Sequence, residues 1–181
     1  MSNKKFPRIY SLSTVGIRNH YNSDYRFHPF RTDFAGDSGV GKSIIADVLQ
    51  LILVGEREFK SATDSSSERE ARKLIIERYG YVFLNIAIDT DKFIVIGMYI
   101  STTSIDPFII QANIGLDVFE PLSSPLISKD FMLGDEIIDI TNLPERMKEN
   151  KQAYAAKLSL NKYHELLEQN KILPIDLKTE G

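Results

Sequence analysis

The residues with the clearest chemical meaning form one octet, Gly36-Asp37-Ser38-Gly39-Val40-Gly41-Lys42-Ser43. It fits the pattern G-x-x-x-x-G-K-[ST] of the phosphate-binding loop. In such a loop the glycines let backbone N–H groups wrap a phosphate, Lys42 reaches the terminal phosphates, and Ser43 ligates Mg²⁺. We therefore predict a site for a nucleoside triphosphate and Mg²⁺, formed by the octet and the following Ile44. The sequence identifies no catalytic residue.

The flanks of the octet indicate the elements that would position it. The segment from Tyr25 to Ala35 has a strand-like apolar pattern with Phe27, Phe30 and Phe34. Lys42 to Leu53 has the composition of a helix that is apolar nearly all round, and Gly55 closes it. A helix that is apolar on every side is normally buried. We expect a strand, the phosphate loop and a buried helix in this order.

Length and composition indicate one globular domain over residues 1–181, with 43% hydrophobic residues and a net charge of −3. The absence of cysteine excludes disulfides, thiolate zinc sites and a cysteine nucleophile. The three histidines, His20, His28 and His164, do not have the spacing of metal ligands. No signal peptide or long apolar run is present, so we expect a cytoplasmic protein without a membrane partner.

Charge is concentrated at the N-terminus. Residues 1–31 contain one acid, Asp24, and six basic residues: Lys4, Lys5, Arg8, Arg18, Arg26 and Arg31. A basic face of this kind can meet nucleic acid. The alternative is a solvated hairpin whose charges bind nothing, because we expect no aromatic side chains between these charges and the segment has no known reader motif.

The rest of the chain predicts helices and β-hairpins. A capping box, Ser65-x-x-Glu68, begins a helix expected to run from Asp64–Ser67 to about Tyr79, before Gly80. The expected strands are Tyr81–Ile88, Lys92–Ser101 (joined by a hairpin across Asp89-Thr90-Asp91) and Pro107–Asn113. Gly115 to Asp135 is expected to be irregular. Two more helices are expected: Leu143–Lys151, opening at Asn142 with Pro144 in its first turn, and Leu160–Asn170.

The predicted fold class is α/β, an α+β lobe with a mixed sheet, β-hairpins and a buried helix after the phosphate loop. Within the single domain we expect three parts. Residues 1–55 would hold the strand, loop and first helix, residues 56–114 a helix and strand hairpin, and residues 115–181 an irregular segment and helices.

The spelling of the octet also occurs in small GTPases, but the rest of the sequence does not support that class. A GTPase needs D-x-x-G after the loop, and the match here, Asp33–Gly36, precedes it. It also needs N-K-x-D to accept hydrogen bonds from guanine. Here Asn161-Lys162-Tyr163-His164 has a histidine at the acidic position. The sequence therefore lacks the acidic residue that would recognise guanine.

Four segments follow the motif order of a known ATPase family. They are Gly16–His20 before the loop, Gly41–Gly55 with Asp47 four residues after the serine, Ile96–Ile100, and Leu158–Asp176 with Tyr163–Leu167 and Ile172–Pro174. In these segments and in most of its length, the chain resembles the N-terminal lobe of an SMC/Rad50/RecN-type ABC ATPase head. The sequence departs from the family pattern at Ser38 (usually asparagine), Val40 (usually a small residue) and Met98 (usually arginine).

The resemblance implies ATP and Mg²⁺ as ligands, with Arg18 approaching the nucleotide. It also implies partners: a C-terminal lobe or second subunit that completes the head, a second head in an ATP-dependent dimer, and DNA in repair, chromosome organisation or defence against foreign DNA. The Q-loop, signature motif and Walker B strand of the family do not occur in these 181 residues. We therefore expect half of a head, which binds ATP·Mg²⁺ and by itself hydrolyses it negligibly.

Two alternatives stay open. A self-contained NTPase, similar to a small GTPase or a kinase, would need an acidic residue at a strand end after the loop, and Asp89 and Asp91 are the candidates. The other alternative is an interaction module switched by its nucleotide.

Overall fold

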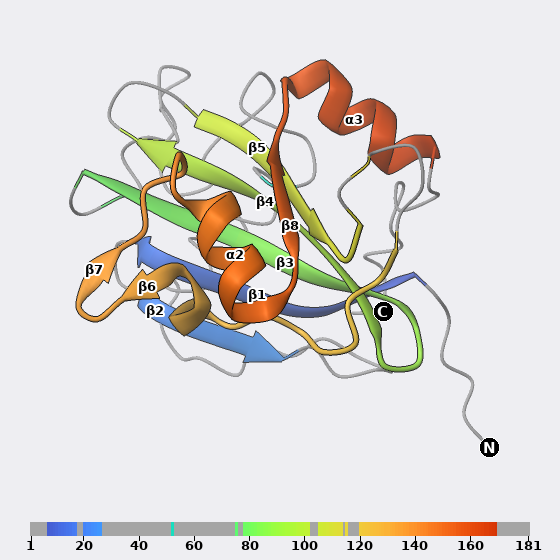
Figure 1. Cartoon of the computed structure of the whole chain (residues 1–181), viewed down its shortest axis with the longest axis horizontal. Helices are drawn as coiled ribbons and strands as arrows, with labels where there is room; N and C mark the ends of the chain where they lie inside the picture. The colour runs from blue at the N-terminus through green and yellow to red at the C-terminus, as the bar shows by residue number, and fades with distance from the viewer. Residues whose placement is uncertain are drawn as a thin grey trace, which may run out of the picture.

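The computed structural model describes residues 7–17, 20–26, 52, 75, 78–101, 105–113, 115 and 120–169. Its main element is a six-stranded sheet (Figure 1). The strands are β1 (Arg8–Ile17), β2 (His20–Arg26), β3 (Tyr79–Asp89), β4 (Lys92–Ser101), β5 (Ile105–Gln111) and β8 (Tyr154–Lys157). Their order is β2-β1-β3-β4-β5-β8, and every neighbouring pair is antiparallel. The parallel pairs of the predicted mixed sheet do not occur within this part of the chain.

The other described elements are shorter. They are the 3₁₀ helix η3 (Ser128–Phe131), β6 (Met132–Leu133), β7 (Glu136–Ile137), α2 (Leu143–Lys151) and α3 (Leu160–Gln169). Helix α2 has the predicted bounds, with Asn142 at its N-cap position and a proline in its first turn. Helix α3 ends one residue before the prediction. None of the described helices is long and apolar enough to cross a membrane.

The central hairpin confirms the strands predicted after residue 80. Strands β3 and β4 are buried along nearly their whole length on both faces, which explains their almost continuous apolar sequence. A turn at Thr90-Asp91 joins them, and Asp91 adopts a φ of 57° there. The predicted third strand is β5, which begins and ends two residues earlier than expected.

The prediction that a helix runs to about Tyr79 is wrong at its C-terminal end. Strand β3 begins at Tyr79, and Ile75 already forms an antiparallel bridge to Ile17. Gly80, the expected stop of that helix, lies inside the strand. A Cβ atom at this position would come within 2.4 Å of the Val15 carbonyl oxygen. The glycine therefore permits close packing of β3 on β1. The beginning of this predicted helix lies outside the described residues.

The elements predicted around the octet are described only at their edges. Strand β2 ends at Arg26, so it includes just the first two residues of the strand expected over Tyr25 to Ala35. Ile52 is helical and fully buried, in agreement with the buried helix expected over Lys42 to Leu53. The remaining residues of both elements lie outside the described part.

One face of the sheet, the aliphatic face, contacts Ile52 and α3. Fifteen buried residues form this cluster: Ile9, Leu12, Ile17, Ile52, Val82, Leu84, Ile86, Ile94, Ile96, Met98, Ile100, Ile109, Tyr163, Leu166 and Leu167. All but Tyr163 are aliphatic or methionine. Because side chains alternate along a strand, these are the residues of one parity in β3 and β4.

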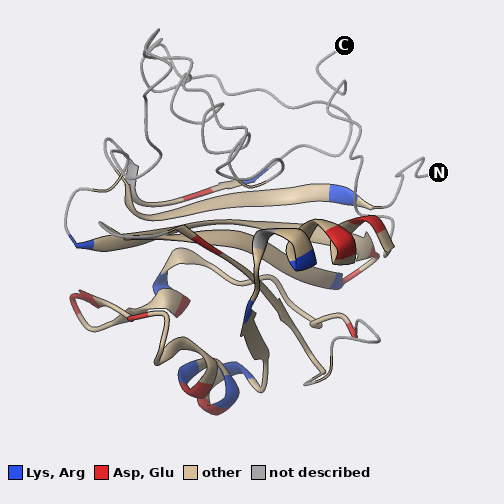
Figure 2. Ribbon diagram, turned by 90° about the horizontal axis from the view of Figure 1, so that it is seen from above, with Lys and Arg blue, Asp and Glu red and all other residues tan. Residues whose placement is uncertain are grey.

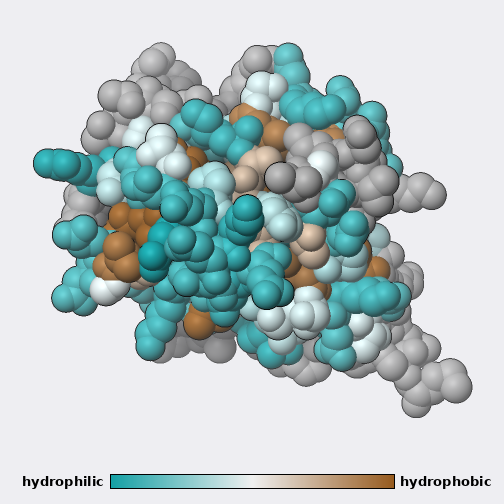
Figure 3. Space-filling view, in the orientation of Figure 1, coloured by the Kyte–Doolittle hydropathy of each residue, from teal (hydrophilic) through white to brown (hydrophobic). Residues whose placement is uncertain are grey.

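The other face, the aromatic face, is covered by the chain from residue 120 to residue 153. Figure 2 shows α2 and the β6–β7 hairpin on this side of the sheet. Its centre is a group of five buried rings from Tyr81, Phe83, Tyr99, Phe108 and Phe131. The segment predicted to be irregular up to Asp135 indeed holds only η3 and β6 among its described residues. On this side, the outer surface of the molecule is largely hydrophilic, with small separate hydrophobic areas (Figure 3).

Candidate functional site

The predicted phosphate-loop residues Gly36 to Ile44, and Arg18, lie outside the described residues. The structure instead describes residues on either side of them: Ile17 and His20 around Arg18, and Arg26 and Ile52 around the octet. These flanking residues show which face of the sheet the surrounding chain is fixed to.

Ile52 is the described anchor of the chain that follows the octet. It is fully buried on the aliphatic face, and its carbonyl oxygen accepts a hydrogen bond of 2.7 Å from the Tyr163 hydroxyl. Tyr163 is itself fully buried in α3, and this burial raises the pKa of its hydroxyl above the ordinary range. Leu166 and Leu167 pack α3 into the same cluster. A buried hydrogen bond therefore ties α3 to the helical residue behind the phosphate loop.

The β1–β2 hairpin fixes the residues around Arg18. Ile17 and His20 pair directly, so Arg18 and Asn19 connect two paired residues. Gly16 precedes them with a φ of +73°, and a Cβ atom there would lie 2.7 Å from Cδ1 of Ile137. Ile17 belongs to the same cluster as Ile52. Arg18 thus directly follows a residue of the aliphatic face, the face that holds Ile52.

The structure explains why Met98 stands where the ATPase family usually has arginine. Met98 is fully buried in β4, surrounded on the aliphatic face by isoleucine and leucine side chains. The described side chains around this position offer no counter-ion to a guanidinium group, whose burial here would carry a large desolvation cost. The thioether instead completes the apolar packing.

The acidic residues considered for a self-contained NTPase have a structural role. The carboxylate of Asp89 accepts a hydrogen bond of 2.7 Å from the Thr90 amide, and Asp91 occupies the left-handed position of the same turn. Aspartate is common in such turns for this reason. Across the described residues, no group of three or more acidic or histidine side chains could hold a metal ion.

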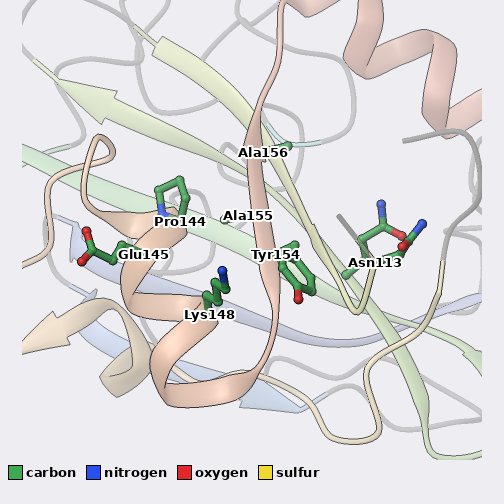
Figure 4. A pocket seen from close by; sticks show the side chains of 8 residues that line it. Asn113, Pro144, Glu145, Lys148, Tyr154, Ala155 and Ala156 are labelled. Atoms are coloured by element: carbon green, nitrogen blue, oxygen red, sulfur yellow. The ribbon is translucent and has the colours of Figure 1, made fainter. Parts of the chain in front are cut away.

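A pocket of about 370 Å³ lies between β5, α2 and β8 (Figure 4). It is lined by Gln111, Asn113, Pro144, Glu145, Lys148, Tyr154, Ala155 and Ala156. Its wall holds one cation and one carboxylate, without a glycine-rich turn. Helix α2 packs on the aromatic face, so the pocket is on the opposite side of the sheet from Ile52. These features do not match a triphosphate site.

The described residues reveal one arrangement that the sequence analysis missed. The guanidinium carbon of Arg26 lies 4.0 Å from the centre of the Tyr10 ring, and that of Arg8 lies 5.8 Å from it. Phe93 meets the same ring edge to face at 4.8 Å. The prediction that no aromatic residue is interleaved with the basic ones is therefore wrong. The arrangement depends on strand pairing between β1 and β2, which residue spacing alone does not show.

Comparison with known proteins gives one type of similarity. No protein-family model matches the chain, and no curated protein matches it. A solved structure from work on ATP-driven dimerization and DNA-stimulated activation of SMC ATPases is similar, with a TM-score of 0.52 and 16% identity. The similarity covers 93% of this chain and 82% of that chain. The chain has an SMC-ATPase-like fold. This agrees with the sequence resemblance at the level of the fold.

Proposed function

We propose that this chain is the ATP·Mg²⁺-binding N-terminal lobe of an SMC/Rad50-like ATPase that acts on DNA. The observation that carries the proposal is the SMC-ATPase-like fold of a chain with a complete phosphate-loop octet between β2 and the buried helical residue Ile52. In this proposal the octet and Ile44 bind the phosphates, Ser43 ligates Mg²⁺ and Arg18 approaches the nucleotide.

One feature of the structure favours ATP over GTP as the ligand. The sequence nearest to a guanine-binding N-K-x-D motif is Asn161 to His164, which lies within α3. Tyr163 in its middle is fully buried and bonded to Ile52. Because these residues lie within a helix that Tyr163 packs on the sheet, they do not form a loop that reads a base.

Hydrolysis requires groups that the 181 residues do not contain, namely a Walker B carboxylate and a signature serine. We propose that a C-terminal lobe or second subunit supplies them, and that ATP brings two heads together. The similar SMC ATPase structure comes from work on ATP-driven dimerization and DNA-stimulated activation, which supports this extension.

The test is calorimetric titration of the chain with ATP and with GTP in Mg²⁺, together with a phosphate-release assay. We expect binding of ATP in preference to GTP, weaker binding when Mg²⁺ is chelated, and negligible release. Lys42→Ala should abolish binding, because the terminal phosphates lose their cation. Lys162→Ala is the matched control, since Lys162 is an exposed lysine of α3 paired with Glu165. Preference for GTP, or steady phosphate release, would contradict the proposal.

A further inference from the structure

Arg8, Tyr10 and Arg26 form a cluster at one corner of the aromatic face. Arg8 pairs with Ala87, and Arg26 pairs with Ser11, so both arginines stand on this face. The register of β1 against β3 shifts between Ile9 and Ser11. This irregularity, a β-bulge, places Tyr10 on the same face as its neighbour Ser11. The bulge therefore brings an aromatic ring between two guanidinium groups.

Within the described part of the chain, the cluster holds two like charges and no carboxylate paired with them. Nε and Nη1 of Arg8 are buried and have no hydrogen-bond acceptor. Burial, followed by the neighbouring charge of Arg26, lowers the pKa of Arg8, and Tyr10 offsets part of this effect. Buried donors without acceptors are rare in native proteins, and a bound ion is one of the explanations for them.

Asp24, the acidic residue closest in sequence to Arg26, is engaged elsewhere. Its carboxylate accepts hydrogen bonds from the Ser13 hydroxyl and from both the amide and hydroxyl of Ser128. These bonds attach η3 to β1 and β2. Among the described residues, neither Arg8 nor Arg26 has an ion pair with a carboxylate. Within the described residues the cluster therefore has no counter-ion.

The chemistry of the cluster fits a phosphate group. Guanidinium groups match the oxygens of a phosphate with parallel N–H donors, and stacking on Tyr10 keeps Arg26 in one orientation. The Tyr10 ring already contacts Arg26 and Phe93, so it is not open for stacking a base. Recognition would therefore be of backbone phosphate, independent of sequence.

We propose that Arg8 and Arg26, oriented by Tyr10, bind a phosphate of the nucleic-acid backbone. The proposal rests on the DNA-binding part of the proposed function, and it assigns the place on the molecule where DNA binds. This position is on the face of the sheet opposite Ile52, so it does not depend on the helix behind the phosphate loop. The whole chain carries a net charge of −3, so its overall charge does not favour binding to nucleic acid. Binding must come from a local cluster.

The test is fluorescence anisotropy of a labelled DNA duplex titrated with the full chain at salt concentrations from about 50 to about 200 mM. Arg26→Gln and Arg8→Gln should each weaken binding about tenfold at the lowest salt, the effect of losing one charge-assisted hydrogen bond. Each should also reduce the slope of log affinity against log salt by about one. Arg26→Lys should restore only part of the affinity, because an ammonium group lacks the planar fork.

Lys162→Gln is the matched control, because it removes one positive charge from exposed α3 and should leave DNA affinity unchanged. Circular dichroism melting of each variant checks that it is folded. Competition by inorganic phosphate and by ATP distinguishes a site for backbone phosphate from one for small phosphates. If these compete at low concentration in the Lys42→Ala background, the cluster binds phosphate but its source is a small molecule.

Two outcomes would overturn the inference and separate it from the proposed function. If the wild-type chain binds DNA and both arginine variants bind equally well, the position is wrong while the proposed function stands. If the wild-type chain binds ATP but neither DNA nor free phosphate, the cluster is not a phosphate site. Loss of ATP binding in Lys42→Ala, with DNA affinity unchanged, would support two separate sites.

Discussion

The two faces of the sheet are packed by different kinds of interaction. On the aliphatic face the contacts are apolar and non-directional, with the bond from Tyr163 to Ile52 as the described polar link across the cluster. On the aromatic face, Tyr81 donates to the carbonyl of Ile138, and the Asn85 side chain bonds both to Ser11 and to the backbone of Leu126. Among the described residues, directional bonds thus fix the cover of the aromatic face, while α3 and Ile52 pack on the aliphatic face mainly through apolar burial.

This difference predicts that the two faces differ in how easily the elements packed on them can move. Non-directional packing lets an element shift without leaving polar groups unpaired, whereas hydrogen bonds at Asn85 and Tyr81 break when their cover moves. We therefore expect the aromatic face to act as a rigid support. The aliphatic face, which holds Ile52, would be the side where changes near the nucleotide can be accommodated.

The largest effect that tests this comparison is expected at Phe131. It is fully buried and its ring contacts those of Tyr81, Phe83 and Phe108. Phe131→Ala should lower the free energy of unfolding by about 3–5 kcal/mol, measured by urea denaturation, because it leaves a cavity among rigid rings. Leu133→Ala in β6 is the control, since this side chain is 55% exposed, and should change stability by less than about 0.5 kcal/mol. A cost at Phe131 as small as that would refute a rigid aromatic support.

Removal of one tyrosine hydroxyl on each face sharpens the comparison, with a smaller expected change in the free energy of unfolding. Tyr163→Phe removes the bond to Ile52, and Tyr99→Phe removes a bond to the backbone of Ile140 on the aromatic face. Each should cost about 1–2 kcal/mol, because a buried backbone group loses its hydrogen-bond partner. ATP affinity, measured by calorimetry, should fall severalfold only in Tyr163→Phe. Equal ATP affinities in the two variants would show that α3 does not position the helix behind the loop.

The last test concerns stability at alkaline pH. Burial raises the pKa of Tyr99 from 10.0 to about 12, and raises the pKa values of Tyr81 and Tyr163 as well. Above pH 10 the unfolded chain loses these protons first, so the stabilisation is complete below pH 10 and is lost as the pH rises towards 12. Urea denaturation at several pH values from 9 to 11.5 should show this decline. Tyr163→Phe should make it shallower by up to about 1.4 kcal/mol per pH unit. An unchanged slope would contradict this origin.

Local signals predicted some elements well. Asn142 and Pro144 mark the beginning of α2, and the aspartates around Thr90 mark the hairpin between β3 and β4; both kinds of signal lie within a few residues of the element. The four residues of β8 have no comparable pattern, because this strand exists through its pairing with β5. Gly80 was misinterpreted for the same reason, since its role depends on Val15, which lies far away in sequence.

The candidate site divides in the same way. The phosphate-loop octet is readable from sequence because its chemistry lies in consecutive residues, and it remains a prediction. The cluster of Arg8, Tyr10 and Arg26 was not readable, because a bulge in β1 and pairing with β2 bring these residues together. Pairing between distant segments is decided by the whole fold, so spacing along the chain cannot reveal it.

The position of β1 between β2 and β3 has a further consequence for the chain between residues 27 and 77. Strand β1 pairs with β2 on one side and with β3 on the other, so both ends of this intervening chain are attached to a single strand. A backbone cut within it would leave two pieces that share the sheet and can remain associated through β1. Two separately expressed fragments divided there would be expected to reassemble through the sheet.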